Sequence, residues 1–114
     1  MASATALLRV EGLPEGTLEA AAQFHAEVLP QARAALEKGE GLVLVFPPAD
    51  YTHKGWRLAA IQQLARDFAP IRVNAVTSAD ETATAAAAAY LAEAPGVTGQ
   101  LLALDSNGAG EVLS

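Results

Sequence analysis

The sequence alternates short runs of strand character with longer helical stretches, and this alternation limits the possible folds more than any other feature. Each run is bounded by Gly, Pro or Asp, and the run at residues 41–46 is apolar on both faces, which is typical of a strand covered on both sides. We expect strands at residues 41–46, 71–76 and 100–105, with a weaker one at 6–10. The helical stretches between them are Thr17 to Lys38, Thr52 to Ala69 and Ala79 to Ala92.

Strand–helix–strand units repeated in this way predict a parallel sheet with helices packed on it. We therefore expect one α/β domain over residues 1–114, with a small three-layer Rossmann-like fold and three or four parallel strands. The crossover connections should all be right-handed.

The expected helix boundaries have chemical reasons. Thr17 can cap the first helix, and the segment 78–81 (Ser-Ala-Asp-Glu) can open the third. Pro70 should end the second helix. Pro30 lies inside the first helix and should kink it, because proline lacks the N–H of an internal hydrogen bond.

The chain is acidic, with 13 Asp and Glu against 7 Lys and Arg and a net charge of −6. This balance disfavours nucleic acid and anionic membranes as partners, because both carry negative charge. No apolar run approaches the length of about 18 residues that a membrane span needs. The start MASATALL does not resemble a secretory signal, so we expect a cytoplasmic protein. The absence of cysteine excludes disulfides and thiolate catalysis.

The first two helical stretches are more apolar than helices on a sheet need to be. Apolar side chains occupy an arc of roughly 200° around the first helix and roughly 220° around the second, whereas an arc of about 100° suffices for packing on a sheet. Only Arg57 and Asp67 interrupt the second arc. We interpret the surplus as contact with a second copy across a twofold axis, unless water-tolerant alanines account for it. The expected interface residues are Phe24, Val28, Trp56, Ala60, Leu64 and Phe68.

Three stretches of the chain are similar to one protein family. Leu58 to Val76 (LAAIQQLARDFAPIRVNAV) resembles the active-site helix and following strand of the short-chain dehydrogenase/reductase family. Thr82 to Asp105 resembles its last helix and strand, and Val28 to Phe46 resembles an earlier pair. The resemblance covers about three-quarters of the chain and implies a truncated domain, the C-terminal half of a Rossmann-type dehydrogenase without its dinucleotide-binding half.

The resemblance also implies where catalytic residues should stand. The family's reaction uses a Tyr four residues before a Lys, together with a Ser that holds the substrate oxygen. Lys54 matches the Lys, but Asp50 occupies the position four residues earlier and Tyr51 the position three residues earlier. Residues 47–49 (Pro-Pro-Ala) stand where the Ser is expected. We therefore expect no catalytic site, with Tyr51 and Lys54 as residual candidates.

The sequence contains only part of the family's phosphate-binding turn. Gly12 and Gly16 match the first two glycines of the family's phosphate-binding turn, whereas Leu18 replaces the third. Glu11 and Glu15 would place negative charge beside the phosphates. We expect no cofactor, with Gly12 and Gly16 as residual candidates for NAD or NADP.

The two histidines do not indicate a metal site. His25 lies on the apolar arc of the first helix, so we expect a buried or interfacial imidazole there. No spacing of His and carboxylate residues is typical of metal ligands. Asn107-Gly108 has the chemistry of a turn after the last strand.

Two functions follow from these observations. The first is a non-catalytic relative of the reductases that forms a homodimer or tetramer, or docks on a full-length relative. The alternative is an NAD(P)-dependent oxidoreductase of alcohol or ketone substrates, with Tyr51 and Lys54 in a remodelled active site and Gly12 and Gly16 under the cofactor.

Overall fold

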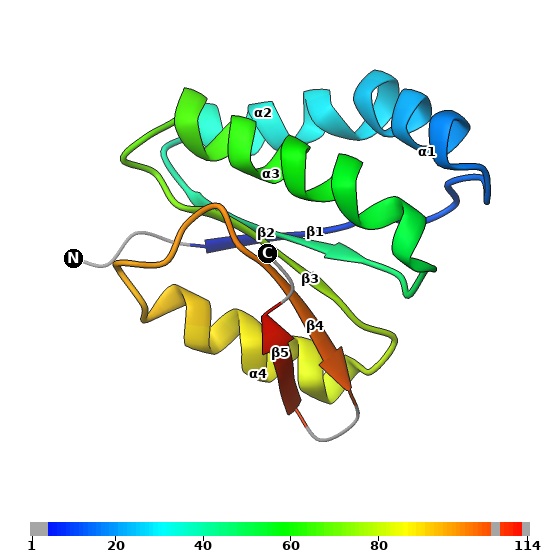
Figure 1. The fold of residues 1–114 in the computed structure, drawn as a ribbon. Coiled ribbons are helices and arrows are strands. Elements are labelled where there is room, and N and C mark those ends of the chain that lie inside the picture. Colours follow the sequence, from blue (N-terminus) through cyan, green and yellow to red (C-terminus); the bar gives the residue numbers. More distant parts are fainter. Residues whose placement is uncertain (1–4, 106–107, 113–114) are drawn as a thin grey trace.

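The computed structural model describes residues 5–105 and 108–112, which form one five-stranded sheet with helices on both faces (Figure 1). The strands lie side by side in the order β1-β2-β3-β4-β5, and the first four are parallel. This confirms the predicted α/β fold with four parallel strands. The strands are β1 Thr5–Arg9, β2 Gly41–Phe46, β3 Val73–Thr77, β4 Leu101–Asp105 and β5 Gly108–Val112.

The last strand, β5, was not predicted. It runs antiparallel to β4, and Gly108 is the register partner of Asp105. Its sequence, GAGEV, contains two glycines and carries little strand propensity by itself. The predicted turn at Asn107-Gly108 begins at a residue that lies outside the described part of the chain.

The helical elements follow the predicted stretches, with one distortion. The first stretch is divided by a π-helical segment that ends two residues before Pro30. Because Pro30 lacks an N–H and its ring crowds the preceding turn, the wider π turn takes the place of the expected kink. The elements are α1 Thr17–Gln23, η1 Phe24–Val28, α2 Leu29–Glu37, η2 Tyr51–His53, α3 Lys54–Asp67 and α4 Glu81–Ala92. In the described residues, no helix has both the length and the apolar character that a membrane crossing requires.

Two apolar cores separate the three layers. The elements from α1 to α3 cover one face of the sheet, where Phe24, Leu44 and Ile61 are fully buried. Helix α4 covers the opposite face, where Ala87 and Leu91 pack against valines of β2 and β3. The two helical layers are seen above and below the sheet in Figure 1.

One crossover connection has the opposite hand to the other two. The strands follow one another in a single direction across the sheet, yet the helices before β3 lie on one face and α4 lies on the other. The prediction that all crossovers are right-handed is therefore wrong. Placing α4 with the other helices would leave Val43, Val45 and Val76 in water, and the burial of this second apolar face favours the observed arrangement.

The apolar arcs of the helices are covered within the chain itself. Helices α2 and α3 lie side by side on the same face of the sheet (Figure 1), so each buries one flank on the sheet and another on its neighbour. Of the residues expected at a subunit interface, Phe24, Val28, Ala60 and Leu64 are buried in this core, and Trp56 and Phe68 are partly buried against it. The width of the arcs therefore gives no ground for a subunit contact, and dimerisation stays a prediction.

Caps at the helix starts only partly follow the sequence. Asp80 caps α4 as expected, because its Oδ1 accepts hydrogen bonds from the N–H groups of Thr82 (2.8 Å) and Ala83 (3.1 Å). The expected cap by Thr17 is wrong. Gly16 is the N-cap residue of α1, and the Thr17 hydroxyl instead donates to Oγ1 of Thr52 at 3.0 Å.

Arg72 closes the C-terminal end of α4. Its guanidinium donates to the carbonyl oxygens of Leu91 (2.8 Å), Ala92 (3.2 Å) and Ala94 (2.7 Å). The last carbonyls of a helix have no partner within the helix and carry its negative dipole end, so a cation there is stabilising. Arg72 therefore fixes α4 to the start of β3.

The buried Asn74 fixes the connection from α4 to β4. Its Nδ2 donates to the carbonyl of Val97 (3.0 Å), and its Oδ1 accepts from the N–H of Gln100 (3.1 Å). Gly99, between them, has a φ of 75° and donates its N–H to the carbonyl of Val73 at 2.7 Å. A side chain at Gly99 would be strained at this φ, so this tight turn requires glycine.

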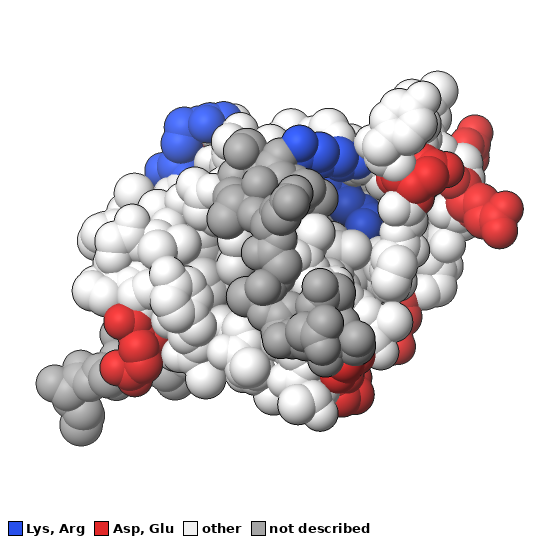
Figure 2. Space-filling model, turned by 60° about the horizontal axis from the view of Figure 1, so that its bottom comes forward, with Lys and Arg blue, Asp and Glu red and all other residues white. Residues whose placement is uncertain are grey.

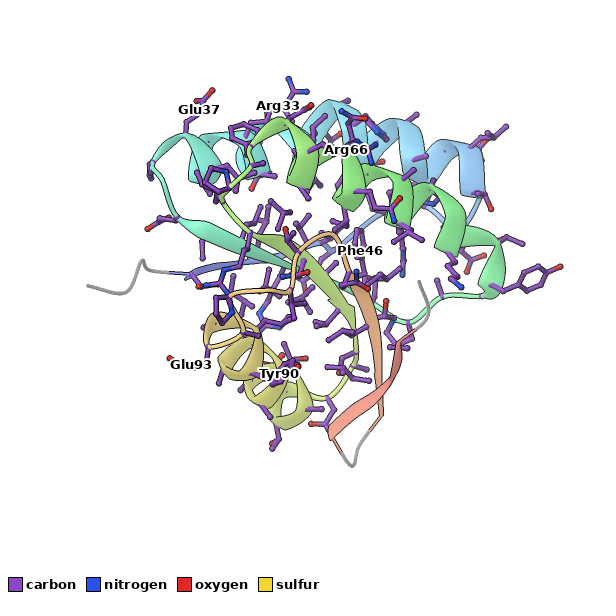
Figure 3. All side chains as sticks on the ribbon, turned by 60° about the vertical axis from the view of Figure 1, so that its left-hand side comes forward. Arg33, Glu37, Phe46, Arg66, Tyr90 and Glu93 are labelled. Carbon is purple, nitrogen blue, oxygen red and sulfur yellow. The ribbon has the colours of Figure 1, made fainter. Side chains whose placement is uncertain are left out.

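Replacing Arg72 tests its role at the end of α4. Arg72→Met should lower the free energy of unfolding by about 1–3 kcal/mol, because three carbonyl oxygens lose a charged donor. Arg33→Met is the matched control, since Arg33 is exposed and points outward from the helical layer (Figure 3). Urea unfolding of both variants checks this, and equal stabilities would contradict the capping role.

Candidate functional site

The carboxyl ends of the four parallel strands meet at one edge of the sheet, which is where α/β folds of this kind usually bind ligands. The cavities there include two adjacent ones of about 410 and 310 Å³. The larger lies between the loop after β1 and the loop after β2, and the smaller lies beside it toward β3 and β4. Both are lined by Ala49, Asp50, His53 and Arg57.

Arg57 of α3 is the central side chain of this edge. Only 6% of it is exposed, and its guanidinium carbon lies 4.6 Å from the ring centre of Phe46 and 5.8 Å from that of Trp56. Nη1 donates to the carbonyl of Pro47 at 3.0 Å. The buried Nε has no acceptor within residues 5–104. Burial lowers the pKa of Arg57 from its ordinary value, although arginine stays protonated in proteins.

His53 joins the loop after β1 to helix α3. The indole Nε1 of Trp56 donates to Nδ1 of His53 at 3.1 Å, and Nε2 of His53 lies 2.9 Å from the carbonyl oxygen of Glu15. An indole can only donate and a carbonyl can only accept, so Nδ1 is the acceptor and Nε2 carries the proton. The imidazole is therefore neutral with both nitrogens engaged, and its role in this arrangement is structural.

Asp50 shapes the turn that carries Tyr51 and Lys54. Its Oδ1 accepts from both the N–H (2.9 Å) and the hydroxyl of Thr52, which makes Asp50 the N-cap of η2. These two hydrogen bonds, from the hydroxyl first, lower the pKa of the exposed Asp50 carboxyl. The position that would hold a catalytic Tyr in the family is thus used as a cap.

The residual catalytic candidates lie at the rim of the smaller cavity. Tyr51 and Lys54 both line it, but Tyr51 is 88% exposed and Lys54 is exposed as well. The loop after β2 presents Pro47, Pro48 and Ala49 and no hydroxyl group. The structure thus brings Tyr51 and Lys54 to one cavity, without a serine side chain from this loop.

The glycines of the expected phosphate turn do not form a cradle. Gly12 has a φ of 77° and opens to solvent, with no atom within 4 Å of where a Cβ would stand. At Gly16, the same position is occupied by the carboxylate of Glu19 from the first turn of α1. A dinucleotide pyrophosphate at this helix start would meet a negative group, so these residues do not fit an NAD or NADP phosphate.

The other titratable residues do not add a site. His25 is exposed, with Nδ1 2.7 Å from the carbonyl oxygen of Ala21, so the expectation of a buried imidazole is wrong for the single chain, and an interfacial one stays a prediction. The helix turns this residue away from the core although the neighbouring Phe24 is buried. No group of three or more His, Asp or Glu side chains in the described residues could hold a metal ion.

Arg57 was not singled out from the sequence as a functional residue. Its position in the sequence could have indicated it, because Arg57 is one of two charged residues that interrupt the apolar arc of its helix and it follows Lys54 by one turn.

The charged groups on the surface are scattered. In Figure 2 the residues coloured as Lys and Arg occupy the upper part of the face, and the acidic residues form separate groups near the rim.

The fold and its carboxyl edge define the class of the protein, an α/β domain of Rossmann type with the cavities at the strand ends where such domains bind ligands. A model of one protein family, described as short chain dehydrogenase-like protein (SDR-like), matches residues 8–104. The chain therefore belongs to this family, which confirms the resemblance seen in the sequence. No curated protein and no solved structure matches the chain.

The cap at Asp50 makes stability depend on pH. Because the folded protein lowers the pKa of Asp50, its contribution is present above the pKa of the unfolded chain and is lost as the pH falls through the folded value. Asp50→Asn keeps an acceptor but removes the charge, so wild type should be more stable than this variant near neutral pH. The difference should shrink between about pH 7 and about pH 3 in urea unfolding. A difference that is constant with pH would contradict this.

Proposed function

We propose that the chain is a non-catalytic member of the short chain dehydrogenase-like family whose function is to pair with a second copy of itself along the free edge of β1. The position four residues before Lys54 is a capping aspartate, Tyr51 points into solvent, and the loop after β2 carries no hydroxyl. Loss of a proton-transfer group typically lowers an enzymatic rate by about 10²–10⁴-fold, which makes the family's oxidoreductase chemistry a poor fit.

The observation that carries the pairing is the state of β1 at the edge of the sheet. It pairs with β2 on one side, and no other described strand pairs with it. Leu7 of β1 is 43% exposed, whereas its register partner Val43 is 1% exposed, because α4 covers β2 but not β1. Arg9, the one charge of the strand, is already paired with Glu81 at 2.8 Å.

Free edge strands are normally protected by Lys, Pro or a bulge, because their unpaired N–H and C=O groups invite another strand. The strand TALLR contains neither Lys nor Pro, and it pairs with β2 in continuous register. A strand of this kind fits addition of a partner strand.

A second copy is the occupant that the sequence of β1 suits. In an antiparallel pair centred on Leu7, this residue faces its own copy across the twofold axis, Ala6 faces Leu8, and Thr5 faces Arg9. No like charges oppose each other, and the apolar cross-strand pairs are each worth about 0.2–1 kcal/mol. Such a contact is closed and self-complementary, as twofold dimers require.

A charge at the centre of this strand tests the pairing. Wild type should sediment with twice the 11.7 kDa mass of the chain. Leu7→Lys would place two ammonium groups opposite each other and should weaken the dimer by at least about tenfold. Leu18→Lys is the control, because Leu18 is equally apolar and 82% exposed but lies on α1.

Sedimentation equilibrium over a series of concentrations measures these masses. A monomeric wild type, or a Leu7→Lys variant that dimerises as well as wild type, contradicts pairing at β1. Loss of the dimer in Leu18→Lys as well as in Leu7→Lys would show that the effect is not specific to β1, and it would contradict this pairing too.

A second candidate function is an NAD(P)-dependent oxidoreductase, which is favoured by the convergence of Tyr51 and Lys54 on one cavity. The Glu19 carboxylate beside Gly16 opposes cofactor phosphates.

Titration with reduced cofactor separates the two functions. We expect neither NADH nor NADPH to raise the melting temperature of the protein, because a ligand stabilises a fold only if it binds the folded state. Glu19→Gln is the informative variant, since it removes the negative group at the would-be phosphate site. A rise in melting temperature with wild type would support the oxidoreductase instead.

A further inference from the structure

We propose that the smaller cavity at the carboxyl edge binds a small organic monocarboxylate, with the carboxylate accepting hydrogen bonds from the guanidinium of Arg57 and the apolar body lying in the cavity. This site is separate from the edge of β1 and does not depend on pairing between copies.

The first ground is the unusual state of Arg57. A buried charge is costly unless it is paired and hydrogen-bonded, and arginine is rarely fully buried without a partner. Arg57 forms no ion pair with any carboxylate among residues 5–104, where the recorded ion pair is between Arg9 and Glu81. Of its five N–H groups, one is seen to donate, to the carbonyl of Pro47.

The second ground is that the guanidinium is held in place before any ligand arrives. Phe46 and Trp56 lie against it at 4.6 and 5.8 Å, and the Pro47 carbonyl fixes one end of its plane. Phe46 itself lies between the sheet and the helices, as Figure 3 shows. A fixed guanidinium is suited to the planar geometry of a carboxylate, because its donors are already oriented.

The orphan donor on Nε points to an incomplete site. Buried donors without an acceptor are rare in native proteins and each requires an explanation. Nε is buried and without an acceptor in the described residues, whereas Nη1 donates to the carbonyl of Pro47. A carboxylate in the cavity would accept from the guanidinium N–H groups that face it and would supply the counter-charge that Arg57 lacks in the described part of the chain.

The walls of the cavity define the kind of acid. Its volume of about 310 Å³ is in the range of small-molecule sites. Ala49 and Leu101 provide apolar surface, and Thr77 adds a hydroxyl-bearing side chain. Lys54 adds a second cation at the rim, whereas Asp50 brings one negative charge. This balance favours a monoanion with an apolar body over a phosphate dianion.

Benzoate is a suitable probe, and benzamide is its neutral counterpart of nearly the same shape. Isothermal titration calorimetry should detect benzoate binding to wild type but no binding of benzamide. Arg57→Met should weaken benzoate binding by at least about tenfold, because it keeps the volume of the side chain but removes the charged donors. Arg66→Met on the same helix is the control, since Arg66 is exposed and donates a hydrogen bond to Oε1 of Gln63 at 2.9 Å.

The stability of the free Arg57→Met variant gives an independent readout. Replacing an unpaired buried charge by an apolar side chain of similar size is often neutral or stabilising, so this variant should fold with an unchanged or raised melting temperature. A variant that loses benzoate binding while keeping its stability separates a ligand group from a merely structural arginine.

Several results would overturn the proposal. These are no benzoate binding by wild type, equal binding by Arg57→Met, equal loss in Arg66→Met, or binding of benzamide as tight as that of benzoate. Binding of inorganic phosphate in preference to benzoate would also overturn it, because the site would then take a different class of anion.

Discussion

The contact among three aromatic rings is the interaction on which the rest of this structure depends. Phe24, Phe46 and Trp56 come from η1, β2 and α3, and their ring centres lie 5.3–5.8 Å apart in tilted and edge-on arrangements. Aromatic pairs in these geometries stabilise a fold by more than the burial of their apolar area alone. They join the helices on this face of the sheet to the carboxyl end of β2, and the rings of Phe46 and Trp56 also lie against the guanidinium of Arg57. Core packing and the candidate site therefore share their residues.

The sequence stretches that resemble the family contain residues that stabilise the fold of this chain. Arg72 and Asn74 lie in the stretch Leu58 to Val76 and hold the end of α4 and the turn into β4. Gly99 lies in the stretch Thr82 to Asp105 and supplies a backbone conformation that other residues rarely adopt. None of these contacts involves a reacting group. The stretches that resemble the family therefore hold the sheet and its helices together.

The strands and helices could be predicted because burial and local chemistry agree along most of the chain. Residues 41–46 are apolar on both faces and form the buried strand β2, and Asp80 caps α4 as its position suggests. The arcs of the first two helices give no ground for a subunit contact, because the periodicity of one helix does not reveal that α2 and α3 lie side by side. The face of the sheet on which α4 packs is likewise set by residues far from α4 in the sequence, the valines of β2 and β3.

The candidate site was predicted less completely than the fold. Tyr51 and Lys54 were named from the family's spacing as residual candidates, and both line the smaller cavity at the carboxyl edge. Arg57 was missed as a functional residue, since its burial depends on Phe46 and Trp56 and on the loop after β2, which the sequence does not bring together. A charged residue on a predicted apolar arc indicates where an unusual side chain lies, but it does not indicate which groups surround that side chain.

The imidazole of His53 has a mechanical consequence for the larger cavity. One nitrogen holds the main chain at Glu15 and the other holds the indole of Trp56, so a single ring spans from the loop after β1 to the third helix. The ring therefore restrains the loop after β1 relative to α3 beside the larger cavity.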